Sequence, residues 1–152
     1  MKKICTTHTL SLYSSKQLEE YLGGMRIGIF DIETLGLNPT TSPMILAGFM
    51  SMDGENQYTI KQYFAQTPNE EIEIINQLKE DFKNIDYLLT FNGKHFDMPF
   101  VAKRAYNNKI FDIETGLYNL DLYLILNGLI LHQHLKFQQK LNRLCVQSLL
   151  YF

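Results

Sequence analysis

Cysteine and long apolar runs are both scarce in this sequence of 152 residues. The two cysteines, Cys5 and Cys145, are too few for a disulfide framework and indicate the reduced thiols of a cytoplasmic protein. Polar residues interrupt the stretch that follows Lys2 and Lys3, and no apolar run approaches the roughly 18 residues of a membrane span. We therefore expect neither a signal peptide nor a transmembrane helix.

An excess of charge of either sign is also lacking. Fourteen basic and sixteen acidic side chains give a formal net charge of −2, so any contact with nucleic acid requires a local basic patch or a bound cation. Hydrophobic residues make up 45% and charged residues 20%, which excludes disordered, collagen-like and coiled-coil proteins. The length is typical of one domain.

Apolar patterning predicts a mixed α/β fold. Strands are expected at residues 26–33, 44–52, 57–64 and 86–91, and the first is apolar on both faces, as in a central buried strand. Residues 4–13 form either an edge strand or an ordered leader. Helices are expected at 15–22, 68–84, 97–107, 121–131 and 136–150. Two local signals support this order: Asp53-Gly54 as a hairpin turn, and Thr67-Pro68-Asn69-Glu70 as a capping box.

Two acidic residues lie near the end of the 26–33 strand. Asp31 and Glu33 are two positions apart, so a strand places both carboxylates on one face. Such a pair is neutralised by a proton or by a cation, and Mg²⁺ or Mn²⁺ is the ion that prefers carboxylate oxygens. The alternative is that one acid faces solvent and the other caps the following loop.

A second polar segment, Asn92-Gly93-Lys94-His95-Phe96-Asp97, follows the 86–91 strand. Ligand sites of open α/β sheets lie at such carboxyl ends, and Asp97 at a helix start would gain from the helix dipole. Taken alone, Asp97 is as well explained by helix capping, and Phe96 and Phe100 by core packing. The nearby basic residues either contact phosphates or form a solvated helix face; they are Lys94, Lys103, Arg104 and Lys109.

Together, the motifs Phe30-Asp-Ile-Glu-Thr-Leu-Gly-Leu37 and Asn92-Gly-x-x-Phe-Asp-x-Pro-Phe100 resemble the DnaQ-like (DEDD) 3′–5′ exonuclease superfamily, and the second is most similar to YprB-type domains. The resemblance covers residues 26–131. It implies a ribonuclease H-like mixed sheet, with a three-strand antiparallel meander plus a parallel strand and flanking helices. Residues 1–152 would form one such domain, with 1–25 as leader and 132–152 as C-terminal helix.

The resemblance also implies the site. Asp31, Glu33 and Asp97 match the carboxylates that hold two Mg²⁺ or Mn²⁺ ions. Thr34 and Leu35 match positions that hold the terminal nucleotide of a single-stranded DNA or RNA, and Asn92 and Phe96 match residues that shape the pocket around Asp97. From the basic cluster described above, Lys94 is added as a further nucleic-acid contact. The expected function is metal-dependent 3′–5′ exonuclease-like hydrolysis of nucleic acid.

The third motif of this family, an aspartate preceded by a histidine or tyrosine on a C-terminal helix, is not found. Asp121 is the last acidic residue, and the final 31 positions contain neither Asp nor Glu. The chain is then truncated or frameshifted before this motif, or it is a catalytically inactive member that binds nucleic acid, or another group substitutes. Candidate substitutes are Asp112, Glu114, Asp121, His132 and His134, although Asp121 is more simply the cap of its helix.

The final expected helix has an apolar side formed by Leu141, Leu144, Cys145, Leu149 and Leu150. This side is expected to pack on the sheet. If its normal partner helix is absent, the exposed apolar stripe would promote self-association.

Overall fold

The computed structural model describes residues 1–9, 24–52, 57–113 and 117–129. The chain divides into two compact units, Met1–Asp121 and Leu122–Phe152. Within the second unit, residues 122–129 are helical. Several predictions lie outside the described residues: the helix at 15–22, the Asp53-Gly54 turn, Glu114, His132, His134 and the final helix with its role in self-association. Among the helices described, none is long and apolar enough to cross a membrane.

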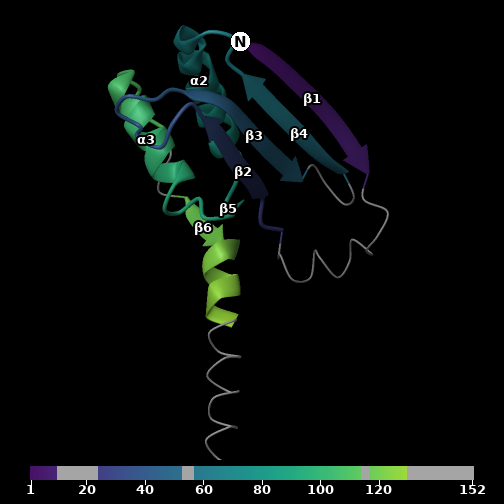
Figure 1. Ribbon diagram of the computed structural model, residues 1–152. Coiled ribbons are helices and arrows are strands. Elements are labelled where there is room, and N and C mark those ends of the chain that lie inside the picture. Colours follow the sequence, from purple (N-terminus) through teal and green to yellow (C-terminus); the bar gives the residue numbers. More distant parts are fainter. Residues whose placement is uncertain (10–23, 53–56, 114–116, 130–152) are drawn as a thin grey trace, which may run out of the picture. The chain divides into compact units, whose positions relative to one another are not determined.

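The first unit is built on a six-stranded mixed sheet (Figure 1). Its strands are β1 (Lys2–Thr9), β2 (Ile27–Thr34), β3 (Met44–Met52), β4 (Gln57–Phe64), β5 (Tyr87–Thr90) and β6 (Tyr118–Asp121). Their spatial order is β1-β4-β3-β2-β5-β6. Strands β1 to β4 pair antiparallel, whereas β5 is parallel to β2 and β6 is parallel to β5. The predicted meander and parallel strand are confirmed, and β1 is an edge strand.

Strand β6 differs from the sequence-based expectation. The helix predicted at 121–131 is helical at 122–129, but Asp121 belongs to the strand that precedes it. Strand β6 has four residues, of which only Asp121 is buried, so neither its length nor its exposure gives a readable alternation.

The helix predicted at 68–84 consists of a short 3₁₀ turn, Pro68–Glu70, followed by α2 (Glu71–Phe82). The predicted capping box was wrong, because the Thr67 side chain makes no capping hydrogen bond. Glu70 instead accepts a hydrogen bond from the Gln66 amide at 2.7 Å and pairs with the amino terminus of Met1 at 2.9 Å. Helix α3 (Asp97–Asn107) has the predicted bounds.

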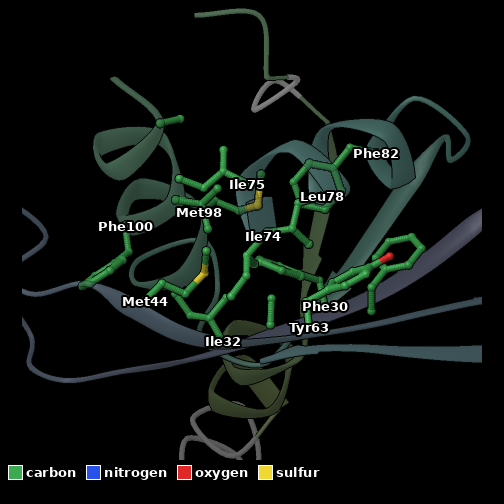
Figure 2. Packing of buried hydrophobic residues seen from close by; sticks show 14 of the residues in the cluster. Phe30, Ile32, Met44, Tyr63, Ile74, Ile75, Leu78, Phe82, Met98 and Phe100 are labelled. Atoms are coloured by element: carbon green, nitrogen blue, oxygen red, sulfur yellow. The ribbon is translucent and has the colours of Figure 1, made fainter. Parts of the chain in front are cut away.

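Only one face of β2 is covered by the described residues, contrary to the prediction of a strand buried on both faces. Phe30 and Ile32 are buried, whereas Ile29, Asp31 and Glu33 are exposed. Figure 2 shows Phe30 and Ile32 gathered in one core with side chains of α2 and α3. Ile29 is apolar but lies on the opposite face, which is why its residue type misled the prediction. The alternation therefore places the acidic pair on the open face of the sheet.

Candidate active site

Four acidic residues lie at or just beyond the carboxyl ends of three neighbouring parallel strands, at one edge of the sheet. Asp31 and Glu33 lie near the carboxyl end of β2, Asp97 opens α3 shortly after β5, and Asp121 ends β6. Because β2, β5 and β6 are parallel, their carboxyl ends lie at the same end of the sheet, which we call the acidic edge. The predicted first and second motifs are thus brought to the same place.

Asp97 is buried, with 4% of its surface exposed. Its Oδ1 accepts a hydrogen bond from the Ile32 amide at 3.0 Å, so the side chain reaches across to β2 at the residue between Asp31 and Glu33. The N-cap position of α3 is Phe96, and Asp97 lies inside the first turn, so Asp97 is not the cap residue. Burial raises the pKa of Asp97 to about 6; the charges of Asp31 and Asp121 add to this rise, and the Ile32 amide opposes it.

The donor chemistry of these acids fits a hard divalent ion. Carboxylate oxygens are the ligands that Mg²⁺ and Mn²⁺ prefer. Within the described ranges, no ion pair with Lys or Arg neutralises Asp31, Glu33 or Asp97. In that same part of the chain, no three His, Cys, Asp or Glu side chains stand as a ready group of metal ligands. Asp31, Glu33 and Asp97 therefore carry suitable ligand atoms for such an ion. Asp97 is buried, and Asp31 and Glu33 on β2 are exposed.

Asp121 is also buried, with 3% exposed, and holds the loop between β5 and α3. Its Oδ1 accepts a hydrogen bond from the Asn92 amide at 2.8 Å, and its Oδ2 accepts one from the Lys94 amide at 3.0 Å. The sequence-based prediction gave Asp121 as the cap of the following helix or as a substitute metal ligand; the structure shows that both oxygens also accept hydrogen bonds from this loop. The only sequence signal for this role is an acid at the end of a short segment, which becomes informative once β6 is known to be parallel to β5.

The same loop is shaped by two unusual backbone positions. Asn92 has φ of 62°, in the left-handed region that Asn tolerates better than most residues. Gly93 lies against Thr90, and a Cβ atom at position 93 would come within 2.5 Å of the Thr90 Cβ. Asn92 and Gly93 thus form a tight turn that leads into α3.

Thr34 and Leu35 lie directly after the acidic pair. A shift in the β2–β3 register occurs between Glu33 and Thr34, and the Thr34 hydroxyl donates to the Gly36 carbonyl at 2.9 Å. The Leu35 side chain is 65% exposed. Phe96 is half-buried, with its ring 5.5 Å from that of Phe100. The Thr34 hydroxyl therefore orders its own turn, and Leu35 is one of the apolar side chains exposed to solvent just after β2.

Of the four predicted basic residues, only Lys94 lies beside Asp97. At about 1.5 Å per residue along a helix, Lys103 is about 9 Å further along α3, and Lys109 lies beyond its end. Lys103 lies over the ring of Tyr106 at 5.3 Å. The predicted substitute ligand Asp112 is exposed and paired with Lys79.

Arg104 is not available for the predicted contact with a phosphate, because its guanidinium group pairs with the buried carboxylate of Glu71. Its Nε donates to Glu71 Oε1 at 2.8 Å, and its Nη1 donates to the Pro39 carbonyl at 3.1 Å. Glu71 also accepts from the Met44 amide at 2.7 Å and from Asn108 Nδ2 at 3.3 Å. This cluster joins α2, α3, the start of β3 and the loop that follows β2, and sequence reasoning missed it.

A protein-family model described as the RNase H superfamily matches residues 29–144. The chain belongs to the RNase H superfamily. Among curated proteins, this RNase H superfamily chain is 33% identical over 85 residues to a DNA polymerase of Methanocaldococcus jannaschii, a match that spans 53% of the chain and 5% of the polymerase.

Two solved structures show the same fold. The family B DNA polymerase of the hyperthermophilic archaeon Pyrobaculum calidifontis has a TM-score of 0.57 at 20% identity, over 68% of this chain and 16% of that one. Escherichia coli exonuclease I in complex with an oligonucleotide has a TM-score of 0.55 at 14% identity, over 68% of this chain and 29% of that one. The chain spans less than a third of each of these proteins. The ribonuclease H-like fold expected from the sequence is confirmed.

Proposed function

We propose that this RNase H superfamily domain is a metal-dependent 3′–5′ exonuclease-like domain that acts on the ends of single-stranded DNA or RNA. The observation that carries the proposal is the burial of Asp97 beside Asp31 and Asp121. Burial and these two negative charges raise the pKa of Asp97 to about 6, which marks a place where a cation is favoured.

Asp31, Glu33 and Asp97 would hold the ions. Divalent ions bound there would supply the positive charge and Lewis acidity that phosphodiester hydrolysis requires. The Ile32 amide holds Asp97 against β2, and Asp121 holds the loop that leads into it. This anchoring limits the movement of the carboxylate and keeps it directed toward β2.

The substrate contacts follow from the surroundings of the acids. The exposed Leu35 side chain would pack against the terminal base, Lys94 would contact a phosphate, and Asn92 and Phe96 shape the wall around Asp97. The likeness to exonuclease I, whose structure holds an oligonucleotide, supports a nucleic-acid substrate. The residues of the second motif, Asn92-Gly-x-x-Phe-Asp-x-Pro-Phe100, support a relationship of this domain to YprB-type domains within the superfamily.

A non-catalytic nucleic-acid-binding domain is the second candidate. It is favoured by the use of both Asp121 oxygens in hydrogen bonds to the Asn92 and Lys94 amides, which gives this acid a structural role in the loop before α3. Under this candidate, the domain binds metal and nucleic acid but does not cut.

The test is a calorimetric titration of Mn²⁺ into the purified protein, followed by incubation with a single-stranded oligonucleotide labelled at either end. The first proposal expects metal binding and metal-dependent shortening from the 3′ end in single-nucleotide steps, both lost in Asp31→Ala. Glu80→Ala is the matched control, since Glu80 is an exposed acid of α2 that pairs with Lys83.

The two candidates give different results in the same assay. Metal and oligonucleotide binding without shortening supports the non-catalytic domain. If Asp31→Ala behaves like Glu80→Ala in both metal binding and shortening, the acidic edge of the sheet is not the functional site, and both candidates fail.

A further inference from the structure

Strand β1 is a long edge strand, and among the described strands only β4 pairs with it. All eight of its residues, Lys2–Thr9, are exposed, and its pairing with β4 continues from Lys2 to Thr9 without a register shift. An edge strand points about half of its backbone N–H and C=O groups away from its neighbour. The outer side of β1 is therefore a template on which a further strand can pair.

The usual protections of a sheet edge are confined to the amino end of β1. Natural edges are protected by charged side chains, by Pro, by bulges or by short strands. Lys2 and Lys3 supply charge, but residues 4–9 contain no Pro, Gly, Asp, Glu, Lys or Arg, and they are rich in the β-branched residues that favour strands. Strand β1 also lies before residues 29–144, so the match to the RNase H superfamily does not include it.

The two faces of β1 differ in what they contact. On one face, Lys3 Nζ donates to Gln77 Oε1 of α2 at 3.0 Å. On the opposite face, the His8 ring stacks on that of Tyr58, with the ring centres 5.3 Å apart. Because side chains alternate along a strand, odd positions of β1 lie on the face covered by α2 and even positions lie on the open face.

A two-fold axis perpendicular to the sheet restricts how β1 can pair with β1 of another copy. Such an axis keeps each face on its own side, so opposite residues are both odd or both even, and the axis passes through one residue. An axis at Cys5 would set His8 against Lys2 of the other copy. An axis at Thr6 avoids this contact, because Lys2 then has no opposite residue on the other β1.

With the axis at Thr6, Ile4 lies against His8 of the other copy, and Lys3 lies against Thr9. The first is an aliphatic–aromatic pair, which favours strand pairing, and the second sets the lysine beside an uncharged residue. The two Lys3 residues are offset by about six positions, or roughly 20 Å at about 3.4 Å per residue. This exceeds the Debye length of about 8 Å at physiological ionic strength, so their repulsion is largely screened.

We propose that β1 pairs antiparallel with β1 of a second copy of this chain, about a two-fold axis at Thr6, and joins the two sheets into one. A second copy fits better than an acidic peptide, because the Lys3 ammonium group already donates to Gln77 and lies 5.3 Å from the centre of the Tyr63 ring. Pairing of β1 with the four-residue β6 of another copy would leave half of β1 unpaired. A strand pair is a small interface, so the dimer is weak. Strands β4 and β3 lie between β1 and β2, so the pairing leaves the acidic edge open.

The test measures the mass of the full chain by sedimentation equilibrium from about 10 μM to about 1 mM. The parent is expected to change from monomer to dimer in this range, and amide exchange of β1 is expected to slow as the concentration rises. Thr6→Lys places two like charges opposite each other at the axis and is expected to weaken the dimer about tenfold. Thr41→Lys makes the same change at an exposed threonine of the loop after β2, and is expected to dimerise like the parent.

Mixing two variants tests the position of the axis. Thr6→Lys and Thr6→Glu are each expected to dimerise more weakly than the parent. An equimolar mixture of the two is expected to restore the dimer, because residue 6 of one copy lies opposite residue 6 of the other and the charges then attract. Thermal melting checks that both variants are folded. If they are not, the concentration dependence of amide exchange in β1 of the parent still tests the pairing.

Several outcomes overturn the inference. A folded parent that stays monomeric at about 1 mM refutes the dimer. Equal dimerisation of Thr6→Lys and Thr41→Lys, or β1 amides whose exchange does not change with concentration, assigns any dimer to another surface of the chain. Failure of the mixture to restore the dimer refutes the axis at Thr6. None of these measurements depends on metal binding or on shortening of an oligonucleotide, so this inference and the proposed function fail separately.

Discussion

Arg104→Ala is expected to lower the free energy of unfolding by about 3–5 kcal/mol, the range measured when one partner of a buried ion pair is removed. Glu71 is 1% exposed, and Arg104 is its cationic partner in the structure. Truncation leaves the Glu71 carboxylate buried with hydrogen bonds only from the Met44 amide and Asn108. These two remaining donors place the expected loss toward the lower end, about 3 kcal/mol. At about 2–4 °C per kcal/mol for a chain of this size, the melting temperature falls by roughly 6–12 °C.

The assay is urea unfolding at pH 7, followed by circular dichroism, on the parent, Arg104→Ala and the double variant Arg104→Met with Glu71→Leu. The double variant removes both buried charges and is expected to lose less stability than Arg104→Ala alone, because an apolar pair often replaces a buried ion pair at little cost. Amide exchange in the loop of residues 36–42 is expected to accelerate in Arg104→Ala, since the Pro39 carbonyl loses the shorter of its two side-chain hydrogen bonds and keeps only that from Asn107 Nδ2. A loss below 1 kcal/mol, as for an exposed pair, would refute the reasoning.

Three further perturbations test other parts of the unit. Because burial raises the pKa of Asp97 to about 6, its protonated carboxyl group favours the folded state; this contribution is complete below the ordinary pKa of 3.8 and is lost as the pH rises through 6. Asp97→Asn is therefore expected to stabilise the metal-free protein at pH 7 by on the order of 2 kcal/mol in urea melts with EDTA, and to abolish Mn²⁺ binding. Hydrogen bonds from the Arg26 side chain and amide lower the pKa of Asp86 to about 2. The parent is therefore expected to be more stable than Asp86→Asn by a constant amount above about pH 4, and this advantage is expected to disappear as the pH falls to about 2. An advantage that persists at about pH 2 would contradict this. Gly93→Ala is expected to lower the unfolding free energy by about 1–3 kcal/mol, because its Cβ would lie within 2.5 Å of the buried Thr90 Cβ, and an unchanged urea midpoint would show that the turn relaxes freely.

Elements with a strong period were predictable from the sequence. The strands at 44–52 and 57–64 and the helix at 97–107 have the predicted bounds, because they show a continuous apolar run, an alternating pattern and a helical pattern, respectively, over at least eight residues. Strand β6 lacks such a pattern, since it has four residues and gains its place only by pairing with β5. The two faces of β2 could not be told apart because Ile29 is apolar on the open side.

The candidate site was predictable in part for a related reason. Acids that follow apolar strands mark carboxyl ends, and the parallel arrangement then brings Asp31, Glu33 and Asp97 to one edge. Glu71 and Arg104 were not recognisable, because they are 33 residues apart and both lie on helices where charged residues usually face solvent. Their burial depends on the loop and strand packed around them, which no local pattern reports.

The two buried aspartates at this edge differ in how far the protein itself satisfies them. Asp121 receives a backbone amide on each oxygen, so its charge is supported by the loop that it holds. Asp97 is held by the Ile32 amide on one oxygen, and its pKa is raised by burial and by both neighbouring acids. Of these two carboxylates, that of Asp121 stabilises the fold, whereas the ionised form of Asp97 would be stabilised by additional positive charge. This difference is the physical reason to place a cation at Asp97, with Asp31 and Glu33 beside it, and to assign Asp121 to the loop.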